Sequence, residues 1–163
     1  MRITLPEAEA FCTLITQHTG QEPTSPITGI ATDSRECVSG DLYIALKGDK
    51  VDGHQFIQQA KNNGAAASLI DQDITDINGM YTIHVDDVLA ALGNLARDWR
   101  KQFDVPVIGI TGSNGKTTTK ELLKHIFTDH ENVHATTGNF NTSIGVPLTL
   151  FQLSYEHTIS LIE

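Results

Sequence analysis

The residues best suited to chemistry form one string, GITGSNGKTTTKE, at residues 109–121. Glycines let backbone N–H groups turn inward around an anion, and a following helix N-terminus adds partial positive charge. A lysine placed here reaches the β- and γ-phosphates of a nucleotide, and the next hydroxyl is a ligand for Mg²⁺. The string therefore predicts a loop that binds ATP with Mg²⁺. Its expected binding residues are Gly112, Ser113, Asn114, Gly115, Lys116, Thr117 and Thr118.

The string departs from the general phosphate-loop pattern G-x-x-x-x-G-K-[ST] at one position. Ile110 stands where that pattern has its first glycine. A glycine-rich turn with a surface lysine is the alternative interpretation. The apolar segment before the loop and the helical spacing after it favour a phosphate loop.

A second candidate lies at the end of the segment HTISLIE. An apolar strand that ends in an acidic residue, soon after a phosphate loop, fits the acid that holds Mg²⁺ in such folds. We therefore expect Glu163 and Thr117 to be metal ligands, and Lys116 and Glu163 to be the catalytic residues.

The elements around this loop follow from apolar patterning. The segment DVPVIGIT predicts a strand buried on both faces, as in parallel sheets. Leu122, Leu123, Ile126 and Phe127 recur at helical spacing after the loop. We expect further strands at 132–136 and 157–162, a loop at 137–146 and a short helix at 147–153.

The first half of the chain also alternates strands with helices. Thr4 and Glu7 fit a capping box with Pro6 in the first turn, and Gly20 ends that helix. Asp52 is expected to cap a helix that stops at Gly64. Another helix opens at 86 or 87, with a core-facing stripe at 88, 89, 92, 95, 96 and 99. Strands are expected at 27–32, 42–46, 65–70 and 81–85.

This alternation predicts an α/β fold with mostly parallel pairing. We expect a small domain at 1–84 and the beginning of a P-loop, parallel-sheet domain at 85–163.

Composition excludes several classes of function. The 163 residues carry 11 basic and 20 acidic side chains, a formal charge of -9, which argues against nucleic-acid or anionic-membrane binding. No apolar run is long enough to span a bilayer, and Glu7 and Glu9 interrupt the stretch that a signal peptide needs. Two distant cysteines, Cys12 and Cys37, are typical of reduced thiols in a cytoplasmic protein.

The string TGSNGKTTTKE resembles the phosphate loop of the Mur ligase superfamily, which lacks the same first glycine. The segment TTGNFNTSIGVPLTLF, at 136–151, resembles the branch that adds D-Ala-D-Ala to UDP-MurNAc-tripeptide. The resemblance places Asn139, Asn141 and Thr142 in the substrate site. Ordinary turn chemistry is the alternative role for these three residues.

The N-terminal half resembles the UDP-sugar-binding domain of the same superfamily. The matching elements are D-S-R at 33–35, GDLYIALKG at 40–48 and DGH at 52–54. The resemblance implies that Ser34, Arg35, Lys47 and Gly48 lie near the uridine diphosphate, and Arg35 also has the planar fork that suits phosphate. His54 is a further candidate for this site, or a brace for the helix after Asp52.

The resemblance implies an ATP-dependent ligase that joins D-Ala-D-Ala to UDP-MurNAc-tripeptide through an acyl phosphate. We expect a cytoplasmic monomer with no membrane insertion and no nucleic-acid partner. We expect the 163 residues to be the N-terminal portion of such a ligase, inactive by itself. The alternatives are a Mur-type ligase that adds the third peptide residue, or a stand-alone P-loop module or small kinase.

Overall fold

The computed structural model describes residues 1–48, 51–74 and 79–163. The chain divides into two compact units, Met1–Leu95 and Ala96–Glu163. The division falls inside helix α3 (Val88–Arg100), whereas the sequence predicted it before that helix. The domain boundary at 84 and 85 stays a prediction.

The first unit is built on a five-stranded sheet in the order β1-β2-β3-β4-β5. Strands β2 to β5 are parallel, and β1 is antiparallel to β2. The five strands are β1 (Arg2–Thr4), β2 (Gly29–Ala31), β3 (Asp41–Ile44), β4 (Ala67–Ile70) and β5 (Tyr81–His84). The central strands β2, β3 and β4 are buried along their whole length, which explains their short apolar runs.

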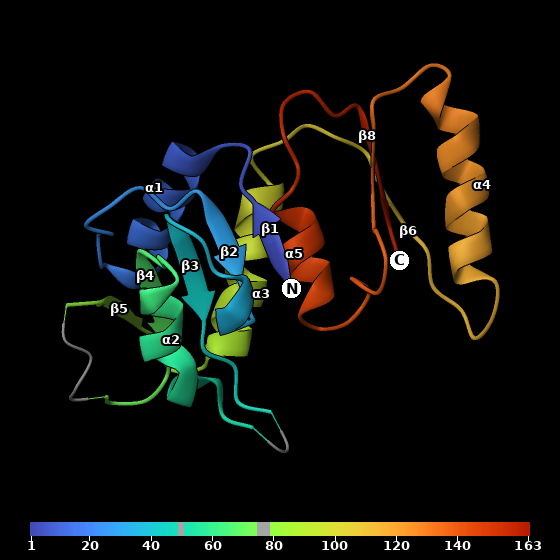
Figure 1. The fold of residues 1–163 in the computed structure, drawn as a ribbon. Helices are drawn as coiled ribbons and strands as arrows, with labels where there is room; N and C mark the ends of the chain where they lie inside the picture. The colour runs from blue at the N-terminus through green and yellow to red at the C-terminus, as the bar shows by residue number, and fades with distance from the viewer. Residues whose placement is uncertain (49–50, 75–78) are drawn as a thin grey trace. The chain divides into compact units, whose positions relative to one another are not determined.

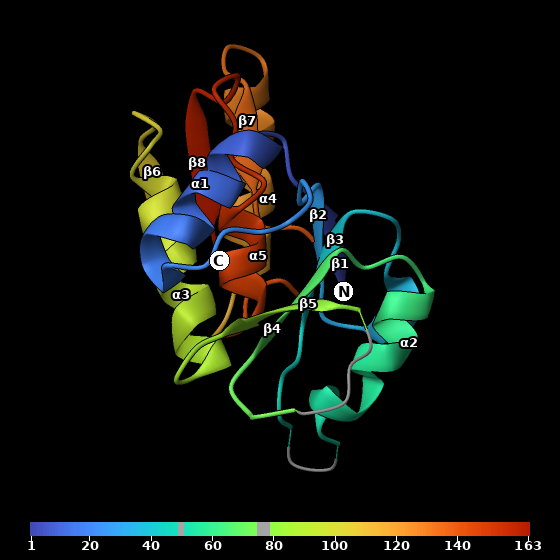
Figure 2. The same ribbon diagram turned by 90° about the vertical axis from the view of Figure 1, so that its left-hand side faces the viewer.

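Helices cover both faces of this sheet. Helix α2 (Ile57–Asn62) lies on one face and α1 (Ala8–Thr19) on the other, as Figure 2 shows. A short 3₁₀ turn, η1 (Ser34–Glu36), follows β2, and another, η2 (Gly53–Phe56), leads into α2. As predicted, Asp52 begins this segment, since its carboxylate accepts the His54 N–H at 3.0 Å. The α/β class with parallel pairing is thus confirmed.

The predicted capping box at the N-terminus is wrong. Thr4 belongs to β1 and pairs with Gly29, and the ladder continues with a bond from the Leu5 N–H to the Thr28 carbonyl at 2.9 Å. Strand pairing therefore takes the residues that local capping would have used. Helix α1 begins at Ala8 with Glu7 as its N-cap, without a side-chain cap, and ends at Gly20 with φ 67°.

One ion pair ties β1 to the interior of the sheet. The Asp41 side chain is completely buried, and its carboxylate accepts from the Arg2 guanidinium at 2.7 and 3.0 Å. The Val38 N–H donates to the same carboxylate at 2.9 Å. A buried carboxylate is stable only when it is paired in this way, so Arg2 fixes the register of the edge strand.

The second unit contains a three-stranded parallel sheet in the order β6-β8-β7. The strands are β6 (Val107–Gly109), β7 (Val133–Ala135) and β8 (Ile159–Ile162). Helix α4 (Lys116–Thr128) runs along one side of this sheet and α5 (Gly145–Leu150) along the other (Figure 1). In this unit Trp99 packs edge-on against Phe103 and Phe151, with ring centroids 5.4 and 6.4 Å away.

The predicted burial of β6 is wrong. Strand β6 was expected to be buried on both faces, yet it is the edge of its sheet and Val107 is 37% exposed. Leu122 and Ile126 of α4 are 59% and 61% exposed, so their apolar spacing marks a face that the described residues leave open. In α3, Leu89 of the predicted core stripe is likewise exposed, while its other five members are buried.

Candidate functional site

The loop at 110–115 connects the end of β6 to the first residue of α4. Gly115 is the N-cap of α4 with φ 78°, a left-handed conformation that glycine adopts without strain, and no side chain caps the helix there. The N–H groups of the first turn of α4 therefore point toward the loop without a side-chain acceptor. An anion is the natural partner for such groups.

Lys116 is folded over this loop. Its Nζ donates to the Gly112 carbonyl at 2.8 Å, so the ammonium lies at the mouth of the loop. Ser113, Asn114 and Thr118 are exposed around it. The seven predicted residues thus form the end of the loop after β6 and the first turn of α4.

Thr117 and Glu163 lie against each other, as the prediction of a shared metal site requires. The Thr117 hydroxyl is 3.0 and 3.1 Å from the two carboxylate oxygens of Glu163 and donates to them. The Asn141 Nδ2 donates to the same carboxylate at 3.0 Å. The structure therefore joins the phosphate loop, the end of β8 and the loop after β7 at one carboxylate.

Sequence reasoning missed a buried lysine beneath this cluster. The Lys120 side chain is 2% exposed, and its Nζ donates to the Thr136 carbonyl at 2.6 Å. The same ammonium lies 3.0 Å from Glu121, where it lowers the pKa of that carboxyl, and 3.9 Å from Glu163. The available signal was its spacing, because residue i+4 after Lys116 shares a helix face with it.

The donors present fit Mg²⁺. A hydroxyl and a carboxylate supply hard oxygen ligands, and Mg²⁺ commonly takes one or two protein ligands and completes its shell with water and phosphate oxygens. Within the described part of the chain, no three His, Cys, Asp or Glu side chains gather into a metal-binding group.

Loop 137–144 carries the other predicted polar residues of this unit. Thr142 lies two residues before Ile144, the N-cap of α5, and its hydroxyl accepts the Gly145 N–H at 3.0 Å, a contact of the ordinary turn type that is the alternative to substrate binding. Asn139 is exposed on the same loop. A Cβ added to Gly145 would lie 2.5 Å from the Phe140 Cα, so only glycine allows the loop to fold this closely over α5.

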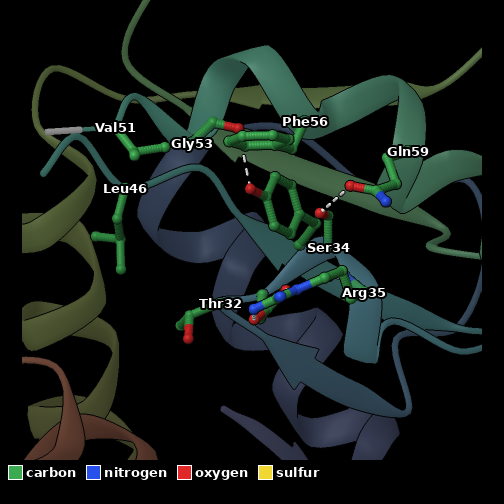
Figure 3. Close-up of a pocket in the computed structure, with 10 residues that line it drawn as sticks. Thr32, Ser34, Arg35, Leu46, Val51, Gly53, Phe56 and Gln59 are labelled. Carbon is green, nitrogen blue, oxygen red and sulfur yellow. Dashed lines mark hydrogen bonds and ion pairs between the residues drawn. The ribbon is translucent and has the colours of Figure 1, made fainter.

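The first unit contains a separate cavity of about 360 Å³ at the carboxyl ends of β2 and β3. Figure 3 shows Ser34 and Gln59 pointing toward one another at the wall of this cavity, where the Ser34 hydroxyl donates to the Gln59 Oε1 at 2.7 Å. The Tyr43 hydroxyl donates to the Gly53 carbonyl at 2.9 Å, and burial raises the pKa of Tyr43 to about 12. The cavity is lined by Thr32, Asp33, Ser34, Arg35, Tyr43, Leu46, Val51, Gly53, Phe56 and Gln59.

Arg35 lines this cavity and is held in a fork with Asp33. The guanidinium donates to the two Asp33 oxygens at 2.9 and 2.6 Å, and this bond lowers the pKa of Asp33 to about 2. The Arg35 side chain remains 77% exposed, so it is free to contact a ligand on its outer side. Asp33 therefore orients the guanidinium.

The remaining sequence-predicted residues of this unit lie around the cavity. Lys47 and Gly48 are exposed in the turn next to it, and the Gly48 N–H donates to the Val51 carbonyl at 2.9 Å. The His54 side chain is 4% exposed, with Nδ1 2.7 Å from Asp52 and Nε2 3.3 Å from Asp71. His54 thus holds the segment after Asp52 in place, which is the alternative to a role in substrate binding.

Sequence reasoning did not propose Tyr43, Phe56 or Gln59 as lining residues. Their types gave no signal, because an aromatic in a strand or a glutamine on a helix is ordinary core or surface chemistry. They come together only because β3, η2 and α2 each contribute one of them to the same cavity.

Two protein families match the chain. The Mur ligase middle domain matches residues 110–163, and the family described as "Mur ligase family, catalytic domain" matches residues 26–100. Among curated relatives, the UDP-N-acetylmuramoyl-tripeptide--D-alanyl-D-alanine ligase of Synechocystis sp. is 45% identical over 138 residues. That match covers 84% of this chain and 30% of the relative, so the chain spans about a third of a ligase of this kind.

Solved structures agree with these matches. A crystal structure of MurF from Acinetobacter baumannii matches with a TM-score of 0.86 and 36% identity, covering 93% of this chain and 35% of that one. MurF ligase from Thermotoga maritima in complex with ADP matches with a TM-score of 0.74 and 35% identity, over 82% of this chain and 31% of that one. By sequence and by fold, over both of its units, the chain belongs to the Mur ligase family.

Proposed function

We propose that this chain provides the sugar-nucleotide pocket and the ATP phosphate loop of a ligase that joins D-Ala-D-Ala to UDP-MurNAc-tripeptide. The product is an amide bond, and ATP activates the peptide carboxylate as an acyl phosphate. The relatives that carry this activity are about three times as long as the chain. The activity is therefore proposed for the protein to which these residues contribute.

The meeting of Thr117, Asn141 and Glu163 carries the proposal. A glycine-rich turn with an ordinary surface lysine would not bring a carboxylate from a strand end, 46 residues away in sequence, to the first turn of the helix. A phosphate loop that works with Mg²⁺ requires this arrangement. The similarity to an ADP-bound ligase structure supports the same assignment.

The first task of the chemistry is to bring two anions together, the γ-phosphate of ATP and a carboxylate. Lys116 and the free N–H groups at the start of α4 reduce this repulsion and stabilise charge as it moves onto the leaving ADP oxygen. Transfer of the γ-phosphoryl group to the carboxylate gives the acyl phosphate. Attack of the D-Ala-D-Ala amine on its carbonyl carbon then releases inorganic phosphate.

We propose that Thr117 and Glu163 hold the Mg²⁺ of Mg·ATP. When bound, the ion withdraws charge from the β- and γ-phosphates. Asn141 keeps the Glu163 carboxylate turned toward Thr117, because its amide donates to Oε1 of Glu163.

We propose that the cavity of the first unit binds the uridine diphosphate part of the sugar nucleotide. Arg35 offers a guanidinium already oriented by Asp33, and the Ser34 hydroxyl lies beside it. The net charge of -9 repels a nucleotide at long range, so the local cation must supply the attraction. Arg35→Ala should weaken UDP binding about 10- to 100-fold, the usual worth of a bond to a charged group.

The proposal extends to compartment and assembly. UDP-linked precursors and ATP occur together in the cytoplasm, so we propose that the protein works there, as a monomer. Among residues 1–48, 51–74 and 79–163, no helix has the length and hydropathy that a membrane span requires.

ATP hydrolysis by the protein encoded by the full reading frame tests the function. We expect phosphate release only when UDP-MurNAc-tripeptide and D-Ala-D-Ala are both present. Mass spectrometry should then detect the UDP-MurNAc-pentapeptide product. The matched assay offers UDP-MurNAc-dipeptide with diaminopimelate or lysine. Turnover in that assay and not in the first would assign the ligase that adds the third peptide residue. Phosphate transfer to another small molecule, with neither peptide substrate required, would indicate a kinase.

A further inference from the structure

The side chain of Lys120 is buried beneath the phosphate loop, where lysine is costly. Its exposure is 2%, and burying an ammonium is unfavourable unless its hydrogen-bonding and charge partners are good. An apolar residue of similar length would fill the same volume without that cost. The contacts of the ammonium therefore indicate what the charge is for.

Those contacts converge on one junction. Lys120 Nζ donates to the Thr136 carbonyl at 2.6 Å, at the end of β7. The Thr136 hydroxyl in turn accepts the Glu163 N–H at 3.0 Å, at the end of β8. Thr136 is thus bound on one side by the lysine and on the other by the backbone of the glutamate.

The lysine also acts on the carboxylate directly. Nζ lies 3.9 Å from Oε2 of Glu163, whose side chain is 3% exposed. The two neutral donors on this carboxylate, Thr117 and Asn141, do not balance its charge. Glu121 also approaches the ammonium, but its side chain is 58% exposed, so water screens that pair.

We propose that Lys120 is a positioning residue for the metal–nucleotide site: it fixes Thr136 and the Glu163 carboxylate so that Glu163 and Thr117 present their oxygens together. Lys116 and Lys120, one turn apart on α4, then have different tasks. Lys116 binds the phosphates, whereas Lys120 orients the carboxylate of Glu163 from the buried side of α4. The inference rests on the proposed function, because it assigns Lys120 to the Mg·ATP site.

The test measures nucleotide affinity with and without metal, in the protein encoded by the full reading frame. Affinity for AMP-PNP is determined by calorimetry with Mg²⁺ in excess over the nucleotide and again in EDTA. The ratio of the two affinities reports the metal-dependent part of binding. We expect Lys120→Met to reduce this ratio about 10-fold or more, the usual effect of losing a residue that orients a metal ligand. The affinity in EDTA should stay at the wild-type value.

Three variants make the test specific. Lys124→Met removes a charge one turn further along α4 and should leave the ratio unchanged. Lys120→Gln keeps a donor for the Thr136 carbonyl without the charge, and carries the test if Lys120→Met does not fold. In Glu163→Gln, adding Lys120→Met should cause no further loss, since the lysine acts through that carboxylate.

The outcomes separate the two proposals. A wild-type affinity that does not respond to Mg²⁺ would overturn the proposed nucleotide site and this inference with it. A normal wild-type ratio that Lys120→Met retains in full would overturn the inference alone. Equal losses with and without metal, accompanied by a lower melting temperature, would show that Lys120 only stabilises the fold.

Discussion

The hydroxyl of Thr117 bridges both carboxylate oxygens of Glu163, at 3.0 and 3.1 Å. This contact links the first turn of α4 to the end of β8. The two segments meet because β8 pairs in parallel with β6, the strand that leads into the loop before α4. The carboxyl ends of parallel strands are where α/β folds assemble ligand sites. The contact therefore marks the edge of the sheet at which we propose that the nucleotide binds.

Thr117→Val should remove one of the two protein oxygens proposed for Mg²⁺ while preserving shape. We expect kcat to fall about 100-fold, in the range for losing one group that stabilises transition-state charge. Raising the Mg²⁺ concentration should recover part of the loss. Thr119→Val on the same helix is the matched control, and equal losses in both variants would count against a metal role for Thr117.

Lys116→Ala should weaken ATP binding about 10- to 100-fold, because a bond from an ammonium to phosphate is worth about 1.5–3 kcal/mol. The melting temperature should remain near the wild-type value, since in the absence of nucleotide the ammonium contacts only a loop carbonyl among the bonds described above. Calorimetric titration with ATP and a thermal melt check both expectations. Unchanged ATP affinity would indicate a surface lysine.

Gly145→Ala tests how loop 137–144 positions Asn141. The added methyl would meet the Phe140 backbone at 2.5 Å, so the loop must move or α5 must shift. Overpacking of this kind costs about 1–3 kcal/mol of stability. We expect a larger relative loss in kcat than in stability, because Asn141 would leave Glu163. Gly93→Ala, where a methyl meets no atom within 4 Å, is the control, and equal behaviour of the two variants would contradict the idea.

His134 predicts a pH dependence of stability. Burial lowers its pKa to about 4, with a further contribution from His157, whose ring centroid is 5.1 Å away. Its neutral ring contacts the Ser160 hydroxyl at 2.8 Å and the Thr149 carbonyl at 2.9 Å. The unfolded chain has a histidine pKa of about 6.5, so between these values it binds more protons than the folded chain.

The free energy of unfolding should therefore be fully retained above about pH 6.5 and fall as the pH drops toward 4, by up to about 3 kcal/mol. Urea titrations at pH 7.5 and 5.0 measure the difference. His134→Gln should be less stable at pH 7.5 but should lose less on acidification. An equal loss in both proteins would assign the effect to other groups.

The sequence was most informative where chemistry and local structure coincide. The loop at 110–115, Lys116 and Thr117 follow from residue types and spacing, and their helix begins at Lys116 in the structure. The position of Glu163 beside Thr117 agrees with the rule that an acid at a strand end lies near the phosphate loop, while its metal role stays a prediction. Strands β2, β3 and β4 could be predicted because each is a short buried run, whereas β1 was missed.

Long-range contacts were beyond this reasoning. Thr4 fits a helix cap locally, and only pairing with Gly29, 25 residues later, makes it a strand residue. Val107 reads as buried, but strand order places it at an edge. The sequence gives no sign that Lys120 is buried, because its partner, the Thr136 carbonyl, is 16 residues away. In each case the structure of the residue depends on a contact with a distant segment, and the local spacing of apolar residues carries no information about such contacts.

The Arg2–Asp41 pair has a practical consequence for anyone who expresses this protein. Strand β1 protects the side of β2 that would otherwise present unpaired backbone groups to solvent. A version that starts a few codons downstream would lose this strand and leave the Asp41 carboxylate buried without its guanidinium. Such trimming should produce an aggregation-prone protein, because an exposed sheet edge and an unpaired buried charge would then occur together.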